Sequence, residues 1–331
     1  MNVIEKYQTV VVVLAIVGGV LVGQVTGVPG LAERLILPFL LVMLLGAFLQ
    51  IPLGNLRKAF RNRRVVGLSL LVNFVWNPLF AVVLGFVFLR EHPALWVGLI
   101  MLMVTPCTDW YLIFTDIADG DVPLATSLLP YNLVLQLVLL PVYLYLFAGE
   151  LVTLPVETLV ESVVLVLVVP LVVAAIGRVT LPKLMGETYF TSTLLPALGP
   201  VQILFLALAI AAMFASQGDV ILDNPGVLLL LAIPVIAFYA INFALGIGIG
   251  RLAAFSYEEV VCFNCTILSR NSPTALAIAV VAFPHEPLIP LALVIGPLLE
   301  LPLLSVVSNL LLELRERELW GRTEALSSGM E

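Results

Sequence analysis

The sequence predicts an all-α polytopic membrane protein with ten transmembrane helices, arranged as two inverted five-helix repeats. Hydrophobic residues make up 61% of the 331 residues and charged residues only 11%, whereas soluble globular domains are about a quarter charged. The apolar residues gather into ten runs, most of about 20 residues or more, which is the length that crosses a bilayer core. Strands of a membrane barrel would instead alternate over about ten residues.

The ten predicted spans lie between charged residues and turn residues. They cover about residues 8–28, 34–53, 66–89, 94–116, 123–148, 159–181, 192–215, 226–250, 258–283 and 287–313. The first run is long and lacks a convincing small-residue cleavage site, so we interpret it as a span and not as a signal peptide. No basic tract suggests nucleic acid, and no Walker sequence suggests an ATP-driven pump. We expect a lipid-embedded transporter with neither a cofactor nor enzymatic activity.

The basic residues predict that both termini lie in the cytoplasm and that the protein is in the plasma membrane. Cytoplasmic loops carry an excess of Lys and Arg. With the N-terminus inside, twelve basic residues lie on the cytoplasmic side, and only Arg34 and Arg90 lie outside. One more, Arg270, remains at membrane depth.

Ten spans divide into two halves of five, and an odd number per half forces the second half to insert upside down. We expect a first repeat over 1–150, a second over 151–315, and a cytoplasmic tail over 316–331. A constant offset of 167 residues pairs three prolines of the fourth and fifth spans with prolines of the ninth and tenth: Pro106 with Pro273, Pro123 with Pro290, and Pro130 with Pro297.

The fourth and ninth spans are both interrupted, by Thr105–Asp109 and Ser269–Pro273. Proline removes a backbone donor and clashes with the preceding turn, so each helix should break there. In lipid, freed backbone groups are tolerated only where protein or a water-filled cavity covers them. Counted from opposite faces, both breaks lie about 20 Å deep. Paired broken helices mark the site of a transporter, so we expect the two to cross and form it.

The cysteines suggest soft-ligand chemistry at one break. The Cys107 thiol lies in the first break and can bind a soft metal or metalloid, although a lone membrane cysteine is often a small buried hydrophobe. Cys262 and Cys265 share a helical face in the ninth span. We interpret these two as packing residues, with a two-thiol capture point for a soft solute as the alternative.

Two ionisable residues at membrane depth are expensive and therefore informative. Arg270 has a structural interpretation, in which it pairs with a carboxylate such as Asp109, and a functional one. In the latter its fixed charge holds an anion or replaces a coupling cation. Glu300 lies between Pro297 and Pro302, and it is a proton-relay or cation-site candidate or the ion-pair partner of Arg270. The remaining substrate-binding candidates are Thr105, Thr108, Asp109 and Asn271 at the breaks and Asn73 in the third span.

Three motifs resemble those of a known family. Thr105–Thr108 is similar to the fourth-span cysteine motif of the arsenite efflux permeases of the arsenical-resistance-3 family. Gly296–Pro302 resembles the tenth-span glutamate motif of that family, and Asn271 with Ala275–Ile278 resembles its ninth-span signature. The family belongs to the bile acid:sodium symporter superfamily. The resemblance implies panel and core domains, crossing broken helices 4 and 9 in the core, and export of trivalent arsenic.

The same resemblance puts Cys107 and Glu300 in the essential positions, and it also exposes departures. Sodium-coupled members carry a glutamate and a glutamine around the ninth-span break, where this chain has Thr266 and Arg270. A cation at that place argues against sodium on Coulomb grounds, so we expect H+ as the coupling ion. Asp109 directly after the cysteine motif is unusual and leaves room for another substrate.

Two hypotheses follow. The first is proton-coupled efflux of arsenite, and of antimonite as a further substrate, through the crossing of the broken helices. The alternative is a transporter of small organic anions of the bile acid:sodium symporter type, in which Arg270 binds the anion and Cys107 is only packed.

Overall fold

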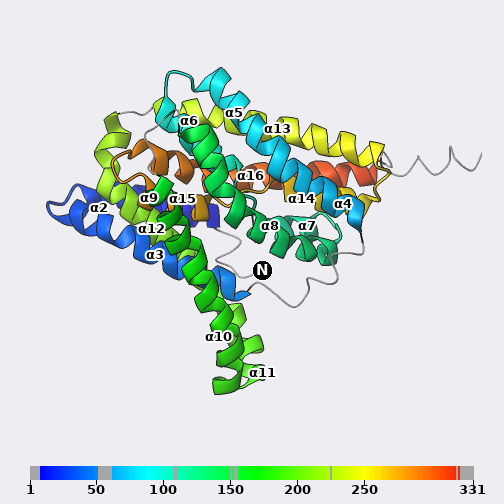
Figure 1. Ribbon diagram of the computed structural model, residues 1–331, viewed down its shortest axis with the longest axis horizontal. Helices are drawn as coiled ribbons and strands as arrows, with labels where there is room; N and C mark the ends of the chain where they lie inside the picture. The colour runs from blue at the N-terminus through cyan, green and yellow to red at the C-terminus, as the bar shows by residue number, and fades with distance from the viewer. Residues whose placement is uncertain are drawn as a thin grey trace, which may run out of the picture.

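The computed structural model describes residues 8–50, 62–107, 110–149, 151, 156–223, 226–317 and 320, and their regular structure is entirely helical (Figure 1). The all-α prediction is confirmed. The helices are, in chain order, α2 (Gln8–Gly23), α3 (Val28–Gln50), α4 (Arg63–Leu71), α5 (Asn77–Phe88), α6 (Pro93–Met103), α7 (Trp110–Ile117), α8 (Val122–Tyr143), α9 (Val156–Val163), α10 (Val169–Met185), α11 (Glu187–Tyr189), α12 (Leu195–Asp223), α13 (Gly226–Leu252), α14 (Tyr257–Leu268), α15 (Ser272–Ala282) and α16 (Leu288–Glu316).

Seven continuous stretches of helix in the described part of the chain are long and apolar enough to cross a membrane: Val28–Gln50, Arg63–Phe88, Val122–Phe147, Val160–Met185, Glu187–Ser216, Leu229–Leu252 and Leu288–Glu316. Three shorter apolar helices accompany them, Val10–Gly23, Pro93–Met103 and Ser272–Ala282. The protein is therefore a multi-span membrane protein. The count of ten spans and the inverted pairing of the halves stay predictions.

Several long helices contain a single π-helical turn: η3 (Val72–Trp76), η4 (Leu144–Ala148), η5 (Val164–Val168) and η6 (Phe190–Leu194). Three of these turns end two residues before a proline, namely Pro78, Pro170 and Pro196. A proline cannot donate to the carbonyl four residues earlier, and a wider turn accommodates that loss. At η3 the freed carbonyl belongs to Phe74, and the Tyr143 hydroxyl donates a hydrogen bond to it. Neighbouring side chains thus satisfy the backbone that proline interrupts.

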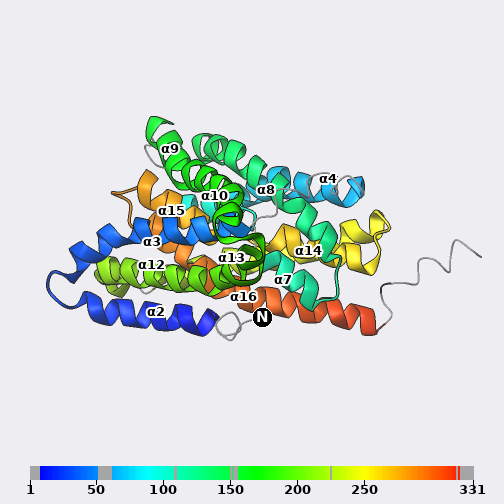
Figure 2. The ribbon, with the colours of Figure 1, turned by 90° about the horizontal axis from the view of Figure 1, so that it is seen from below.

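One layer of the fold is built from α2, α3 and α12, and Figure 2 shows α12 running between the other two. Small residues permit the closest contact. A Cβ atom added to Gly19 would lie 2.4 Å from the carbonyl oxygen of Ala211, and one added to Gly23 would lie 2.5 Å from that of Ala215. Glycines four apart therefore face alanines four apart, which is the small-residue packing by which membrane helices approach.

A second group of helices is built around α16, which packs against α6, α13, α14 and α15. Contact between α6 and α16 again needs a small residue, since a Cβ atom on Gly98 would lie 2.5 Å from the Cβ atom of Ala292. The short helices α6, α7, α14 and α15 are the parts of the two interrupted spans. This group of helices holds the candidate site.

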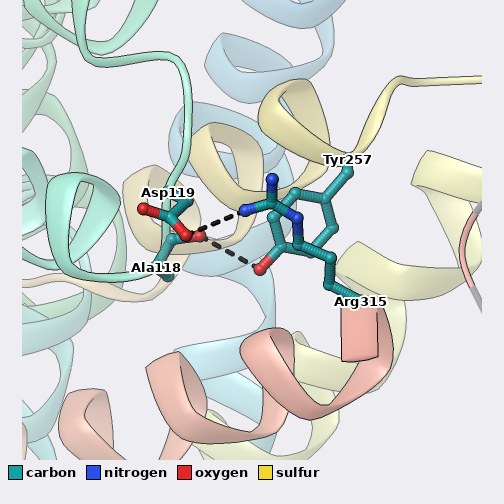
Figure 3. A network of polar contacts seen from close by, with 4 residues as sticks. All are labelled: Ala118, Asp119, Tyr257 and Arg315. Atoms are coloured by element: carbon teal, nitrogen blue, oxygen red, sulfur yellow. Dashed lines mark hydrogen bonds and ion pairs between the residues drawn. The ribbon is translucent and has the colours of Figure 1, made fainter. Parts of the chain in front are cut away.

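A polar cluster joins the ends of three helices, α7, α14 and α16 (Figure 3). The Arg315 guanidinium of α16 donates to Asp119 at 2.8 Å and lies 5.1 Å from the centre of the Tyr257 ring. The Tyr257 hydroxyl, at the start of α14, donates to the Ala118 carbonyl at 3.0 Å. Exposed ion pairs contribute about 0–1 kcal/mol, so this cluster mainly orients the ends of α7, α14 and α16 toward one another.

The close contact of α2 with α12 predicts a sharp difference between neighbouring glycines. Gly19→Ala inserts a methyl group into the backbone of α12 and should destabilise the fold by about 1–3 kcal/mol. Gly18→Ala is the matched control, because nothing lies within 4 Å of its added Cβ atom. The thermal unfolding midpoint of the detergent-solubilised protein should fall for the first variant and hold or rise for the second. Equal midpoints would contradict the packing argument.

Candidate functional site

The two interrupted spans meet at their breaks. Pro106 and Arg270 form an antiparallel bridge, the only isolated bridge among the described residues. The Asn271 N–H donates to the Thr105 carbonyl at 2.7 Å, and the Cys107 N–H donates to the Ser269 carbonyl at 3.1 Å. Each break therefore satisfies backbone groups that the other leaves unpaired, which membrane depth requires.

Four helix ends converge on this bridge. The C-terminal ends of α6 and α14 bring carbonyls without partners in their own helix and a negative partial charge. The N-terminal ends of α7 and α15 bring N–H groups and a positive partial charge. The Asn271 side chain accepts from the Thr274 N–H at 3.1 Å and so caps α15. The Cys107 sulfur accepts from the Trp110 N–H at 3.3 Å, at the start of α7. Only 4% of the Cys107 residue surface is exposed.

The Arg270 side chain occupies the negative end of this arrangement. Its Nη1 donates to the Met103 carbonyl at the end of α6 at 2.8 Å. Nη2 donates to the Ile267 carbonyl at 2.6 Å, and Nε donates to the Leu268 carbonyl at 3.2 Å, both in the last turn of α14. Phe238 of α13 contributes a ring whose centre is 5.5 Å from the guanidinium carbon, close enough for a cation–π attraction. With 1% of its surface exposed, this cation is held by carbonyl dipoles.

Asn73 supplies the one side-chain acceptor of the Arg270 guanidinium, at 2.8 Å from Nη2. It is the first of a row of amides, because Asn77 donates to Asn73 at 3.2 Å and Asn242 donates to Asn77 at 3.0 Å. Trp76 donates to Asn242 at 2.8 Å. The row runs from η3 and α5 to α13 and ends on the guanidinium. Asn73 therefore contacts the predicted site by accepting a hydrogen bond from the Arg270 side chain.

Glu300 contacts the break through the backbone. Its Oε1 accepts from the Arg270 N–H at 2.8 Å, and 4% of its surface is exposed. Close approach of α16 makes this possible: a Cβ atom on Gly296 would lie 2.5 Å from that of Ser272. The ion pairs of the described residues are Arg315–Asp119 and Arg317–Glu313. An ion pair between the side chains of Arg270 and Glu300 is not among them, and the two residues meet through the Arg270 backbone N–H.

The other predicted residues fall into three groups. The Thr105 hydroxyl donates to the carbonyls of Met101 and Leu102, which closes the last turn of α6. Thr108 and Asp109 lie outside the described residues, so their roles remain predictions. Cys262 and Cys265 are completely buried in α14. No cluster of three His, Cys, Asp or Glu side chains suited to a metal occurs in the part of the chain that the structure describes.

Tyr239 of α13 belongs to this site, and sequence reasoning missed it. Its residue surface is 3% exposed, and it interacts electrostatically with Glu300, Arg270 and Cys107. A tyrosine in an apolar run is ordinary, so nothing in its own position singles it out. The available signal is its spacing from Asn242: residues three apart share a helix face, and Asn242 belongs to the amide row.

The amide row generates a prediction about stability. Asn73→Ala leaves the buried guanidinium without its side-chain acceptor and should cost about 1–3 kcal/mol. Asn73→Asp keeps an oxygen at that place, opposite a cation, and should retain most of the stability. Thermal unfolding of both variants in detergent measures the difference. An alanine variant as stable as the wild type would show that the carbonyls alone hold Arg270.

Comparisons with known proteins agree with this architecture. Residues 37–224 match the model of the sodium bile acid symporter family. The arsenical-resistance protein Acr3 of Corynebacterium glutamicum is 26% identical over 91% of this chain and 86% of its own length. The Acr3 protein of Alkaliphilus metalliredigens is 25% identical, over 91% and 90%. The uncharacterized transporter slr0944 of Synechocystis is 28% identical, over 93% and 88%. The family match spans more than half of the chain, which therefore belongs to the sodium bile acid symporter family of membrane transporters.

Proposed function

We propose that the protein exports arsenite from the cell, with antimonite as a further substrate, at the crossing of its two broken helices. The observation that carries the proposal is that Cys107 and Glu300 both bond to the backbone where the two breaks meet: the Cys107 N–H donates to the Ser269 carbonyl, and the Glu300 carboxylate accepts from the Arg270 N–H. Two relatives similar over nine tenths of this chain are arsenical-resistance proteins. Together these support a metalloid substrate.

Cys107 would act as a transient sulfur ligand. Trivalent arsenic is soft and prefers thiolate ligands, and neutral arsenous acid carries three hydroxyl groups. On binding, the S–H proton and one arsenic hydroxyl leave as water while a sulfur–arsenic bond forms. Water reverses the step on release. The net reaction changes no oxidation state, so no redox partner is needed.

Arg270 would replace the coupling cation. In secondary transporters, unwound carbonyls and the C-terminal ends of half-helices coordinate Na+ or H+. Here the carbonyls of Met103, Ile267 and Leu268 already surround a guanidinium. A second cation beside it would meet Coulomb repulsion. Glu300 then remains as the group that exchanges a proton, and the proposed coupling is to H+.

The proposed architecture follows from the family resemblance. Ten spans form two inverted repeats over 1–150 and 151–315, with a cytoplasmic tail over 316–331. Both termini lie on the cytoplasmic side of the plasma membrane. The helices around α16 would form the core domain, while α2, α3 and α12 would belong to the panel. Transport would then be a rocking of one against the other around the fixed site.

The alternative, an organic-anion carrier in which Arg270 binds the anion, has less support. Nε, Nη1 and Nη2 of Arg270 all donate to protein acceptors, and the side chain is enclosed. An anion would have to displace carbonyls from the guanidinium before it could bind. The charge is directed at the carbonyls at the ends of α6 and α14.

The thiol generates the first functional prediction. In cells without their own arsenic efflux, the wild-type chain should lower cellular arsenite, and Cys107→Ser should abolish that effect because oxygen is a poor ligand for arsenic. Cys262→Ala is the matched control, since it removes a buried thiol of α14 away from the bridge. Arsenite export that survives Cys107→Ser would overturn the proposed role of the thiol.

The internal cation generates a second prediction. Replacing external sodium by choline should leave arsenite transport unchanged, because the guanidinium already holds the cation place. Collapse of the proton gradient by an uncoupler should stop concentrative export. Arsenite flux in everted membrane vesicles with defined gradients measures both. A strict requirement for sodium would refute the role assigned to Arg270.

A further inference from the structure

The hydroxyl of Tyr239 lacks a hydrogen-bond partner among the described residues, although it is fully enclosed. Most buried polar groups in native proteins are paired, and leaving one unpaired costs about 1–3 kcal/mol. The Tyr239 hydroxyl is therefore available to bind a group that the polypeptide does not supply.

The other buried tyrosines of the described chain differ in this respect. The Tyr143 hydroxyl donates to the Phe74 carbonyl, and that of Tyr111 donates to the Ala125 carbonyl at 2.9 Å. Tyr257 donates to the Ala118 carbonyl. Each of these hydroxyls ties two helical segments together. Tyr239 makes no such tie, so packing between helices does not explain why position 239 carries a hydroxyl group.

Its surroundings identify where the partner would be. The Tyr239 ring packs edge-on against Phe238 at 5.8 Å between ring centres, and Phe238 is the ring beside the Arg270 guanidinium. The groups that interact with the Tyr239 hydroxyl electrostatically are Glu300, Arg270 and Cys107. These are the three groups assigned to coupling and substrate binding. The unpaired hydroxyl thus lies within electrostatic range of the proposed transport site, next to the ring that covers the Arg270 guanidinium.

We propose that the Tyr239 hydroxyl binds the transported solute by donating a hydrogen bond to an oxygen atom on arsenic. The inference rests on the proposed function and adds a specificity residue to it. Arsenous acid has three hydroxyl groups, and two remain after one has left on bonding to the Cys107 sulfur. A phenol both donates and accepts, so it pairs with such a hydroxyl. This contact selects an oxygen-bearing metalloid over a bare soft cation, which the thiol alone would also bind.

The test is Tyr239→Phe, which removes only the hydroxyl. Arsenite uptake into everted vesicles should show KM raised about threefold to tenfold, the size of one lost hydrogen bond, and antimonite should show the same rise. Thermal stability in detergent should hold or increase, because the unpaired group is gone. Tyr143→Phe is the matched control: it loses the bond to Phe74, so stability should fall while KM stays unchanged.

The outcomes separate the possibilities. An unchanged KM in Tyr239→Phe means that water or nothing pairs with the hydroxyl, and it overturns the inference. A KM that rises only as stability falls assigns Tyr239 a packing role and also overturns it. A wild-type chain that moves neither arsenite nor antimonite refutes the proposed function itself, and the inference falls with it.

Discussion

A positive charge enclosed where two broken apolar helices meet is the constraint on which the centre of this protein depends. Arg270 would be costly there without compensation, and its guanidinium is compensated by backbone carbonyls instead of a carboxylate. Carbonyls are available because α6 and α14 end there. The charge and the two breaks therefore require each other. A continuous helix would bond those carbonyls internally, and broken helices without the charge would leave them unpaired.

Proline has a second consequence in this fold, which is to direct polar side chains toward backbone. Where Pro78 frees the Phe74 carbonyl, Tyr143 donates to it. Where Pro106 interrupts the fourth span, Thr105 and Asn271 take part in closing the gap. Much of the polar capacity at depth is thus used to satisfy peptide groups. The Cys107 sulfur and the Glu300 carboxylate also accept from peptide N–H groups, those of Trp110 and Arg270.

Much of this arrangement could be predicted from the sequence, because the decisive signals are local. Pro106 and Pro273 lie inside apolar runs and so predict breaks in the helices there. Arg270 and Glu300 are easily singled out because a charged side chain is costly in lipid. The direction of the Arg270 side chain was not predictable, since charge suggests a carboxylate partner and only the fold brings the end of α6 beside the end of α14. Whether the Tyr239 hydroxyl has a hydrogen-bond partner depends on which helices pack around it, so the sequence alone does not show it. Thr108, Asp109 and the inverted pairing of the halves stay predictions.

The contacts of Arg270 also bear on how the chain is assembled in the bilayer. Ile267 and Leu268 lie within one turn of Arg270 and can accept its donors as soon as the segment is made. Met103 precedes it by 167 residues and Asn73 by 197. When Arg270 is synthesised, only some of the acceptors of its guanidinium are therefore close by in the chain. The others belong to the first half of the protein, which is synthesised earlier. A separately expressed C-terminal fragment would lack the Met103 and Asn73 acceptors of its buried charge.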